Sequence, residues 1–221
     1  MSESALVFGD YTVDVLVTRP PWYENCYIVT HQPSRAMALI DPGDDGERIL
    51  RFLESAEADG RKLQAIWLTH GHPDHIGAVR EIQETYPVPC YAHAEEKPVI
   101  ENAGRLAAAL TGSGLKVPKS LVYLDDPSQL TLGGLPVQAH LTPGHTPGGL
   151  CFAFPGFVFT GDTLFNHGVG RTDLPGGDGN HLVASITALL SALSEEMVVF
   201  SGHGPSWTVG EARGWWRMMV G

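Results

Sequence analysis

Short hydrophobic runs alternate with amphipathic stretches along the first half of the chain. Runs rich in β-branched and aromatic residues predict strands over residues 5–17, 25–30, 36–40, 65–68 and 88–93. Two helices are expected between them, because apolar residues recur at helical spacing over residues 47–60 and again over 78–86, just before Pro87. Strands and helices that alternate in this way are typical of an α/β protein.

The second half of the chain is richer in predicted strands. They cover residues 121–124, 137–141, 149–154, 157–160 and 198–201, with one helix over 182–193. Between the halves, residues 94–120 are first helical and then contain Gly, Pro and Lys, without a clear strand. A long connection on a rigid scaffold tends to carry function, so we expect this segment to shape a substrate pocket. No repeat, linker or shift in composition divides the chain, which favours one domain over residues 1–221, built as a layered α/β sandwich.

Charge and composition exclude several classes of protein. The chain carries 14 Lys and Arg against 25 Asp and Glu, a formal net charge of -11, which argues against nucleic acid or an anionic membrane as the main partner. With 43% hydrophobic and 18% charged residues, the composition is that of an ordinary folded protein rather than a disordered or coiled-coil one. The longest apolar stretch, residues 182–193, is shorter than the roughly 20 residues that span a bilayer.

Cysteine usage and the first ten residues favour the cytoplasm. Cys26, Cys90 and Cys151 are widely spaced and odd in number, which suits reduced thiols better than a disulfide framework. Residues 1–10 carry an acidic residue and no basic start before their apolar part, so no secretory signal is expected. We therefore expect a cytoplasmic protein, and a homodimer is left open.

A histidine-rich loop, THGHPDHIG, follows the strand predicted over residues 65–68. Within six positions it places four candidate metal ligands: His70, His72, Asp74 and His75. Three more stand at the ends of strand-like runs beside Gly or Pro: His145, Asp162 and His203. Imidazoles combined with a carboxylate suit Zn, Fe or Mn rather than Ca or Mg. The other histidines lack such a motif and are interpreted as ordinary core or surface residues, although His167 follows Asp162 closely enough to line the same cleft.

These motifs resemble the metallo-β-lactamase superfamily, whose signature is a T-H-x-H-x-D-H loop followed by a histidine, a bridging aspartate and a last histidine. The resemblance implies an αβ/βα sandwich of four layers, with the metal site at one edge of the two sheets. It also implies two divalent ions; Zn is the metal we expect, with Fe or Mn as alternatives. By this resemblance, the first ion is held by His70, His72 and His145, the second by Asp74, His75 and His203, and Asp162 bridges them.

The charges of such a site suggest a hydrolytic mechanism. Two divalent ions contribute four positive charges and the two carboxylates, Asp74 and Asp162, remove two, which leaves a net +2 to hold a water between the metals. Water held in this way loses its proton near neutral pH and becomes a hydroxide nucleophile. One metal can then polarise a substrate carbonyl. We therefore take Asp74 and Asp162 as catalytic candidates.

Within the superfamily, the segments NCYIV, ALIDPG and GDTLFNHGVGRTDLPGGD look most like the glyoxalase II-like hydrolases. That resemblance implies a thioester substrate such as S-D-lactoylglutathione, with Arg171 and His167 as candidate substrate-binding residues. An ion pair with Asp173 is an equally good interpretation of Arg171. Two departures put glutathione in doubt: only 18 residues follow His203, where the full-length family has a helical domain, and the usual GHEY reads GHGP here.

Two alternative functions remain open from the sequence. Persulfide dioxygenases share the fold and the loop, but they use one iron, held by the equivalents of His70, His145 and Asp162. The other alternative is a non-catalytic or electron-transfer module of the same fold. Aromatic pairs at 22–23 and 215–216 are interpreted as packing residues rather than site residues. Asp41 is expected to support the ligand loop from behind, and Gly43, Gly148 and Gly161 to allow tight turns near the cleft.

Overall fold

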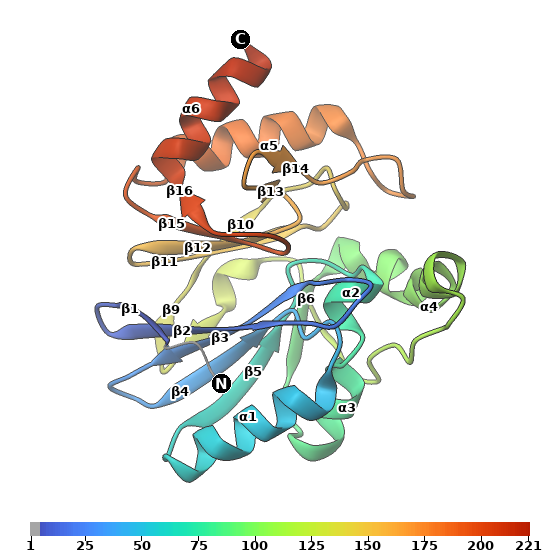
Figure 1. Ribbon diagram of the computed structural model, residues 1–221, viewed down its shortest axis with the longest axis vertical. Coiled ribbons are helices and arrows are strands. Elements are labelled where there is room, and N and C mark those ends of the chain that lie inside the picture. The colour runs from blue at the N-terminus through green and yellow to red at the C-terminus, as the bar shows by residue number, and fades with distance from the viewer. Residues whose placement is uncertain (1–4) are drawn as a thin grey trace.

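Two β-sheets packed face to face form the centre of the computed structural model, which describes residues 5–221 (Figure 1). Residues 1–4, part of the segment interpreted above as lacking a secretory signal, lie outside the described residues. The first sheet has seven strands in the order β1-β2-β3-β4-β5-β6-β7, and the second has five in the order β10-β11-β12-β15-β16. Helices cover the outer face of each sheet (Figure 1).

The first sheet is antiparallel from β1 to β4 and parallel from β4 to β7. Helical segments make the crossovers that its parallel strands need. The strands are β1 (Leu6–Phe8), β2 (Tyr11–Val17), β3 (Asn25–His31), β4 (Ala36–Ile40), β5 (Lys62–Trp67), β6 (Cys90–His93) and β7 (Val122–Leu124). The helices are α1 (Gly46–Ala58), α2 (Pro73–Ile76), α3 (Val79–Thr85), the short 3-10 helix η1 (Ala94–Glu96) and α4 (Lys97–Thr111).

The second sheet is mixed, because β12 pairs with β15 in parallel while the other pairs are antiparallel. Its strands are β10 (Gln138–Leu141), β11 (Leu150–Phe154), β12 (Phe157–Gly161), β15 (Val198–Ser201) and β16 (Trp207–Thr208). The helices α5 (Gly179–Ala192) and α6 (Val209–Val220) cover it. The short elements η2 (Pro127–Gln129), β8 (Thr131–Leu132), β9 (Leu135–Pro136), β13 (Leu164–Phe165) and β14 (Gly168–Val169) complete the fold.

Three hydrophobic cores separate the four layers. Side chains alternate along each strand, so successive residues of β3 face different cores: Tyr27 and Val29 point between the sheets, while Cys26 and Ile28 point toward the helices. The same alternation holds in β11 and β12, where the Phe side chains fill the space between the sheets. Because both faces of these strands are covered, their sequences are continuously hydrophobic. The predicted four-layer α/β sandwich is confirmed.

Several short elements differ from the sequence-based expectation. Residues 5–17 form a hairpin of β1 and β2 rather than one strand, because Gly9, with a φ of 56°, reverses the chain. The two-residue strands β8, β9, β13, β14 and β16 are too short to give a periodic signal. The helix expected in residues 94–120 is present as α4.

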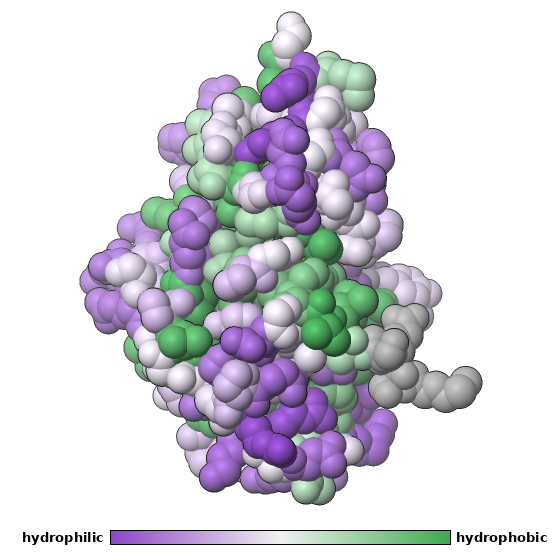
Figure 2. All heavy atoms as spheres, turned by 90° about the vertical axis from the view of Figure 1, so that its left-hand side faces the viewer, coloured by the Kyte–Doolittle hydropathy of each residue, from purple (hydrophilic) through white to green (hydrophobic). Residues whose placement is uncertain are grey.

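The surface beside the β1–β2 hairpin is mixed in character. Figure 2 shows hydrophobic residues gathered across the middle of this side, between two more hydrophilic ends. Leu6, Val7 and Leu135, which belong to β1 and β9, are exposed. Over residues 5–221, no helix combines the length and the apolar character needed to cross a membrane.

Candidate metal centre

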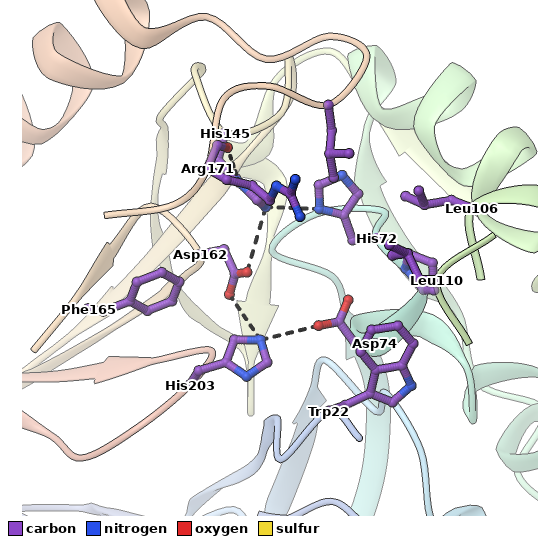
Figure 3. Close-up of a pocket in the computed structure, with 12 residues that line it drawn as sticks. Trp22, His72, Asp74, Leu106, Leu110, His145, Asp162, Phe165, Arg171 and His203 are labelled. Carbon is purple, nitrogen blue, oxygen red and sulfur yellow. Dashed lines mark hydrogen bonds and ion pairs between the residues drawn. The ribbon is translucent and has the colours of Figure 1, made fainter. Parts of the chain in front are cut away.

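The seven predicted ligands meet at one edge of the sandwich. His70, His72, Asp74 and His75 follow the carboxyl end of β5, partly within α2. The other three come from the second sheet: His145 lies in the loop after β10, Asp162 directly follows β12, and His203 follows β15. Because β12 and β15 are parallel neighbours, their carboxyl ends place Asp162 and His203 side by side (Figure 3).

Three imidazoles form the first cluster. His72 Nδ1 lies 2.9 Å from His145 Nε2, which in turn lies 3.2 Å from His70 Nε2. All three side chains are buried. Three nitrogens that converge at this spacing can hold one metal ion.

The second cluster combines a carboxylate with two imidazoles. Asp74 Oδ2 lies 3.2 Å from His203 Nε2 and 3.8 Å from His75 Nε2. These ligand atoms lie within 4.8 Å of one another. Oxygen and nitrogen donors of this kind suit a second divalent ion.

Asp162 lies between the two clusters. Its Oδ2 is 3.7 Å from His145 Nε2, and its Oδ1 is 3.3 Å from His75 Nε2 and 3.7 Å from His203 Nε2. One oxygen therefore faces each cluster, which is the geometry of a bridging ligand. A Cβ atom on Gly202 would lie 2.2 Å from Asp162 Oδ1, so this bridging position requires glycine there.

The ionisation of these groups suits metal binding. Burial, together with the neighbouring imidazoles, lowers the pKa of His70 well below its usual value and that of His72 to about 3. Burial also lowers the pKa of His145. For Asp162, burial opposes ionisation, but the positive charge of His75 outweighs burial and lowers the pKa. Neutral imidazoles at His70, His72 and His145 and an ionised carboxylate at Asp162 are the forms that bind metals. Burial opposes the charged form of His75, but Asp162 and Asp74 outweigh burial and raise its pKa well above the usual value, so an ion at the second cluster displaces a proton from His75.

The polar contacts of the first cluster are those expected of a metal site. His145 Nδ1 donates to the carbonyl oxygen of Arg171 at 2.7 Å, so its Nε2 carries a lone pair. His70 Nδ1 lies 3.1 Å from Thr69 Oγ1, whose own proton goes to Asp41 Oδ2 at 2.5 Å, so His70 donates there and its Nε2 also carries a lone pair. Two lone pairs that face each other at 3.2 Å repel unless a cation lies between them.

Buried atoms of the second cluster also lack partners. Within residues 5–221, His75 Nε2 and Asp162 Oδ1 are buried and make no hydrogen bond. A buried polar atom without a partner is costly, and a metal ion would satisfy both atoms. The residues present therefore fit a pair of divalent ions.

Asp41 supports the ligand loop from behind, at the place expected for it. Its Oδ1 accepts a hydrogen bond from the Thr69 backbone N–H at 2.7 Å, and its Oδ2 accepts one from His75 Nδ1 at 2.9 Å. The carboxylate thus fixes the His75 tautomer in which Nε2 is free to bind metal. Through Thr69, it also fixes the tautomer of His70.

Glu96 links two ligand loops and gave no motif in the sequence. It is fully buried, and its Oε2 accepts from Gly71 N at 2.7 Å while its Oε1 accepts from Gly148 N at 2.8 Å. Gly71 lies between His70 and His72, and Gly148 belongs to the loop of His145. The carboxyl group therefore sets the distance between the two loops that supply the first cluster. Burial raises its pKa against the effect of these hydrogen bonds.

A cavity of about 370 Å³ opens above the ligands. Arg171 lies at its rim (Figure 3), where its guanidinium forms a two-pronged ion pair with Asp173 at 2.6 and 2.7 Å. The structure thus contains the ion pair that was one of the two interpretations of Arg171. His167 is not among the residues that line the cavity, so the expectation that it lines the cleft is wrong. Its ring packs against Trp207 instead, with 5.3 Å between the ring centroids. The β13–β14 hairpin turns at this residue and carries it away from Asp162.

Trp22 was interpreted from the sequence as a packing residue, but it lines the cavity (Figure 3). No local signal distinguishes it, because its position depends on the segment between β2 and β3 lying beside α2. Glu24, two residues later, is fully buried, and neither carboxyl oxygen has a partner within residues 5–221. Burial raises its pKa well above the usual value.

Comparison with known proteins decides the family. A family model described as the metallo-beta-lactamase superfamily matches residues 19–203. The chain belongs to the metallo-beta-lactamase superfamily.

Two relatives match most of this chain and most of their own length. An uncharacterized protein of Mycobacterium leprae is 38% identical over 200 residues, covering 86% of this chain and 90% of the relative. The hydroxyacylglutathione hydrolase GloC of Haemophilus influenzae is 31% identical over 198 residues, with coverage of 86% and 90%.

Solved structures of the superfamily agree with the fold described above. TTHA1623 in a di-iron-bound form has a TM-score of 0.79 and 39% identity, covering 89% of this chain and 96% of that one. The B3 metallo-beta-lactamase BLEG-1 has a TM-score of 0.82 and 31% identity, with coverage of 95% and 100%. Membership of this superfamily, together with the His and Asp clusters, identifies the chain as a metal-binding protein of the metallo-hydrolase type.

Proposed function

We propose that the protein is a binuclear metallohydrolase that cleaves a thioester, similar to glyoxalase II, and that S-D-lactoylglutathione is the first substrate to test. The observation that carries the proposal is the pair of ligand clusters with Asp162 between them. The GloC relative, at 31% identity over most of its length, supports the choice of a thioester. Zn is the first metal to test, with Fe and Mn as alternatives, and the structure of TTHA1623 in a di-iron-bound form supports including iron.

Hydrolysis forms a carbon–oxygen bond to water and breaks the carbon–sulfur bond, so that a carboxylic acid and a thiol leave. Divalent ions held by the His70, His72 and His145 cluster and by the Asp74, His75 and His203 cluster would supply Lewis acidity, which lowers the pKa of water and polarises a carbonyl. The protein supplies the geometry: the rigid strand ends fix the ligands, and Asp41 and Glu96 hold their loops. Asp74 points one oxygen at His203 and directs the other toward the open centre of the site, where it can accept a proton (Figure 3).

The first experiment combines elemental analysis with turnover. We expect about two metals per chain, cleavage of S-D-lactoylglutathione, and no oxygen uptake. About one iron per chain, with oxygen consumed when glutathione persulfide is added, would instead establish the dioxygenase alternative. A metal-loaded protein that cleaves no thioester of any acyl length and consumes no oxygen with glutathione persulfide would favour the non-catalytic alternative.

A variant of the second cluster separates the two enzymes further. His203→Ala removes one ligand of the second cluster and leaves His70, His72, His145 and Asp162 in place. A binuclear hydrolase should lose one metal and most of its rate. A mononuclear dioxygenase should keep both its iron and its rate, which would contradict the proposal.

A further inference from the structure

A second hollow adjoins the metal cavity along α4. Its volume is about 440 Å³, and His72 and Leu106 line both spaces, so the two adjoin at these side chains. Together they form a trough that starts at the ligands and runs under α4, which the sequence already marked as a pocket-shaping segment. Both volumes lie within the usual range of ligand sites, about 300–1,000 Å³.

Away from the metal ligands, most of the side chains that line the trough are apolar, and the polar ones are Arg171, Asn102 and Arg105. Above the ligands, the cavity is lined by hydrophobic side chains from several segments: Trp22, Leu106, Leu110, Phe165 and Leu174. Figure 3 shows Leu106, Leu110 and Trp22 on one side of the open space. Beyond Leu106, the second hollow is bounded mostly by proline, valine and leucine.

The trough offers few partners for a charged substrate arm. Of the residues that line the metal cavity, Arg171 is the one with a guanidinium or ammonium group, and Asp173 already occupies it. In the second hollow, Arg105 donates to the side-chain oxygen of Asn102 on the same helix. A glutathione arm carries two carboxylates and an ammonium group, which would lose hydration here without gaining matched partners.

An apolar occupant fits the exposed part of the trough. Leu110 is 51% exposed although it faces the cavity, and within residues 5–221 no other segment covers it. Covering such a side chain with a hydrocarbon group is favourable because it removes apolar surface from water. Biological carrier thiols are polar, so the arm of a thioester that can be hydrocarbon is the acyl arm.

We infer that the substrate is a thioester with an extended apolar acyl chain, which lies in the trough between Trp22, Leu106 and Leu110 while its carbonyl is at the metal ligands. The inference rests on the proposed thioester hydrolysis and names the class of acyl group. It places short polar acyl groups such as lactoyl among the poorer substrates.

The test keeps the thiol constant and varies the acyl chain. The metal-loaded full chain is assayed with acetyl, butyryl, hexanoyl and octanoyl thioesters of N-acetylcysteamine, a small neutral thiol. We expect kcat/KM to rise about fourfold for each methylene buried in the trough, until the trough is filled. A flat or falling series would overturn the inference.

Two variants place the effect in the trough. Leu110→Ser changes a half-exposed side chain, so the fold should tolerate it, and we expect about a fivefold lower kcat/KM for the octanoyl thioester with the acetyl thioester unchanged. Leu106→Ser should act in the same direction. Ala108→Ser is the matched control, because Ala108 lies on α4 but lines neither cavity, and its acyl preference should equal that of the unmodified protein. Equal losses for both thioesters in Leu110→Ser would contradict the placement.

A binding measurement gives a readout without turnover. Calorimetry with the product carboxylates should show octanoate binding more tightly than butyrate, with a negative heat-capacity change that marks apolar burial. Failure of this inference is distinct from failure of the proposed function. If no thioester is cleaved, S-D-lactoylglutathione included, the proposed function is wrong; if thioesters are cleaved without a preference for longer acyl chains, only this inference is wrong.

Discussion

Asp41→Asn tests whether a buried carboxylate sets the tautomer of a metal ligand. Asp41 Oδ2 accepts a 2.9 Å hydrogen bond from His75 Nδ1, and both side chains are almost completely buried. An asparagine that presents its NH₂ group there would force Nδ1 to accept and move the imidazole proton to Nε2. The nitrogen that faces Asp74 and Asp162 would then be a donor and could not bind metal.

The size of the effect follows from the bond that is lost. A hydrogen bond to a charged group contributes about 1.5–3 kcal/mol, and each 1.4 kcal/mol corresponds to a tenfold change in an equilibrium constant. Affinity for the second metal should therefore fall about 10- to 100-fold, which is the usual loss when a residue that hydrogen-bonds a metal ligand is replaced. The first metal should also bind more weakly, because Thr69 loses its acceptor at Asp41 Oδ2 and no longer orients His70, although His145 keeps its hydrogen bond to the carbonyl of Arg171.

The assay is competition with a chelator, with the metals per chain measured at each step. Asp125→Asn is the matched control, since it removes one negative charge from an exposed side chain that makes no hydrogen bond or ion pair within residues 5–221. Circular dichroism of the metal-free variant checks that the fold is kept. If Asp41→Asn holds two metals with unchanged affinity, the argument from the His75 tautomer is refuted.

Four further predictions address other parts of the structure. Asp162→Ala should remove both metals and the activity, because its two oxygens face the two clusters; normal occupancy on elemental analysis would disprove the bridge. Glu96→Ala leaves two buried backbone N–H groups without an acceptor and should lower the free energy of unfolding in urea by about 2 kcal/mol, whereas exposed Glu95→Gln should not change it. Arg171→Ala should leave the melting temperature unchanged, since the ion pair is exposed; a raised KM for an anionic thioester, with kcat kept, would establish a binding role. Burial raises the pKa of Asp14 against the opposing charge of Arg61, so the stability that the protonated carboxyl contributes is present below the ordinary pKa of 3.8 and is lost as the pH rises through the raised pKa. At pH 7, Asp14→Asn removes a buried charge and should therefore unfold at a higher urea concentration than the unmodified protein. Equal urea midpoints at pH 7 would contradict this reasoning.

The set of candidate ligands that the structure brings together could be predicted because it is encoded locally. Four of its members lie within six positions, and the others stand beside Gly or Pro at the ends of hydrophobic strands, where the chain must turn. The four-layer sandwich was predictable for a similar reason, since long hydrophobic runs alternate with amphipathic helices.

The rest of the site depends on contacts between distant segments. Trp22 gave no signal, because its place over the ligands is set by how the segment before β3 lies against α2. Glu96 is an ordinary acidic residue in the sequence, and its role appears only when residues 71 and 148 are brought to either side of it. For His167, the prediction was wrong for the opposite reason. It is close to Asp162 in sequence, but it lies at the turn of the β13–β14 hairpin and packs against Trp207.

Each cluster takes ligands from both sheets, and this makes an ion at either position a cross-link between the two halves of the sandwich. His75 and His203 are joined by a long stretch of chain, so an ion that binds both closes a large loop in the way a disulfide does. The affinity for metal then depends on how closely and at what angle the two sheets pack against each other. A substitution at Val29, which packs between the sheets and lies far in sequence from every candidate ligand, should first make the metal easier to remove with a chelator, before any change in secondary structure is seen.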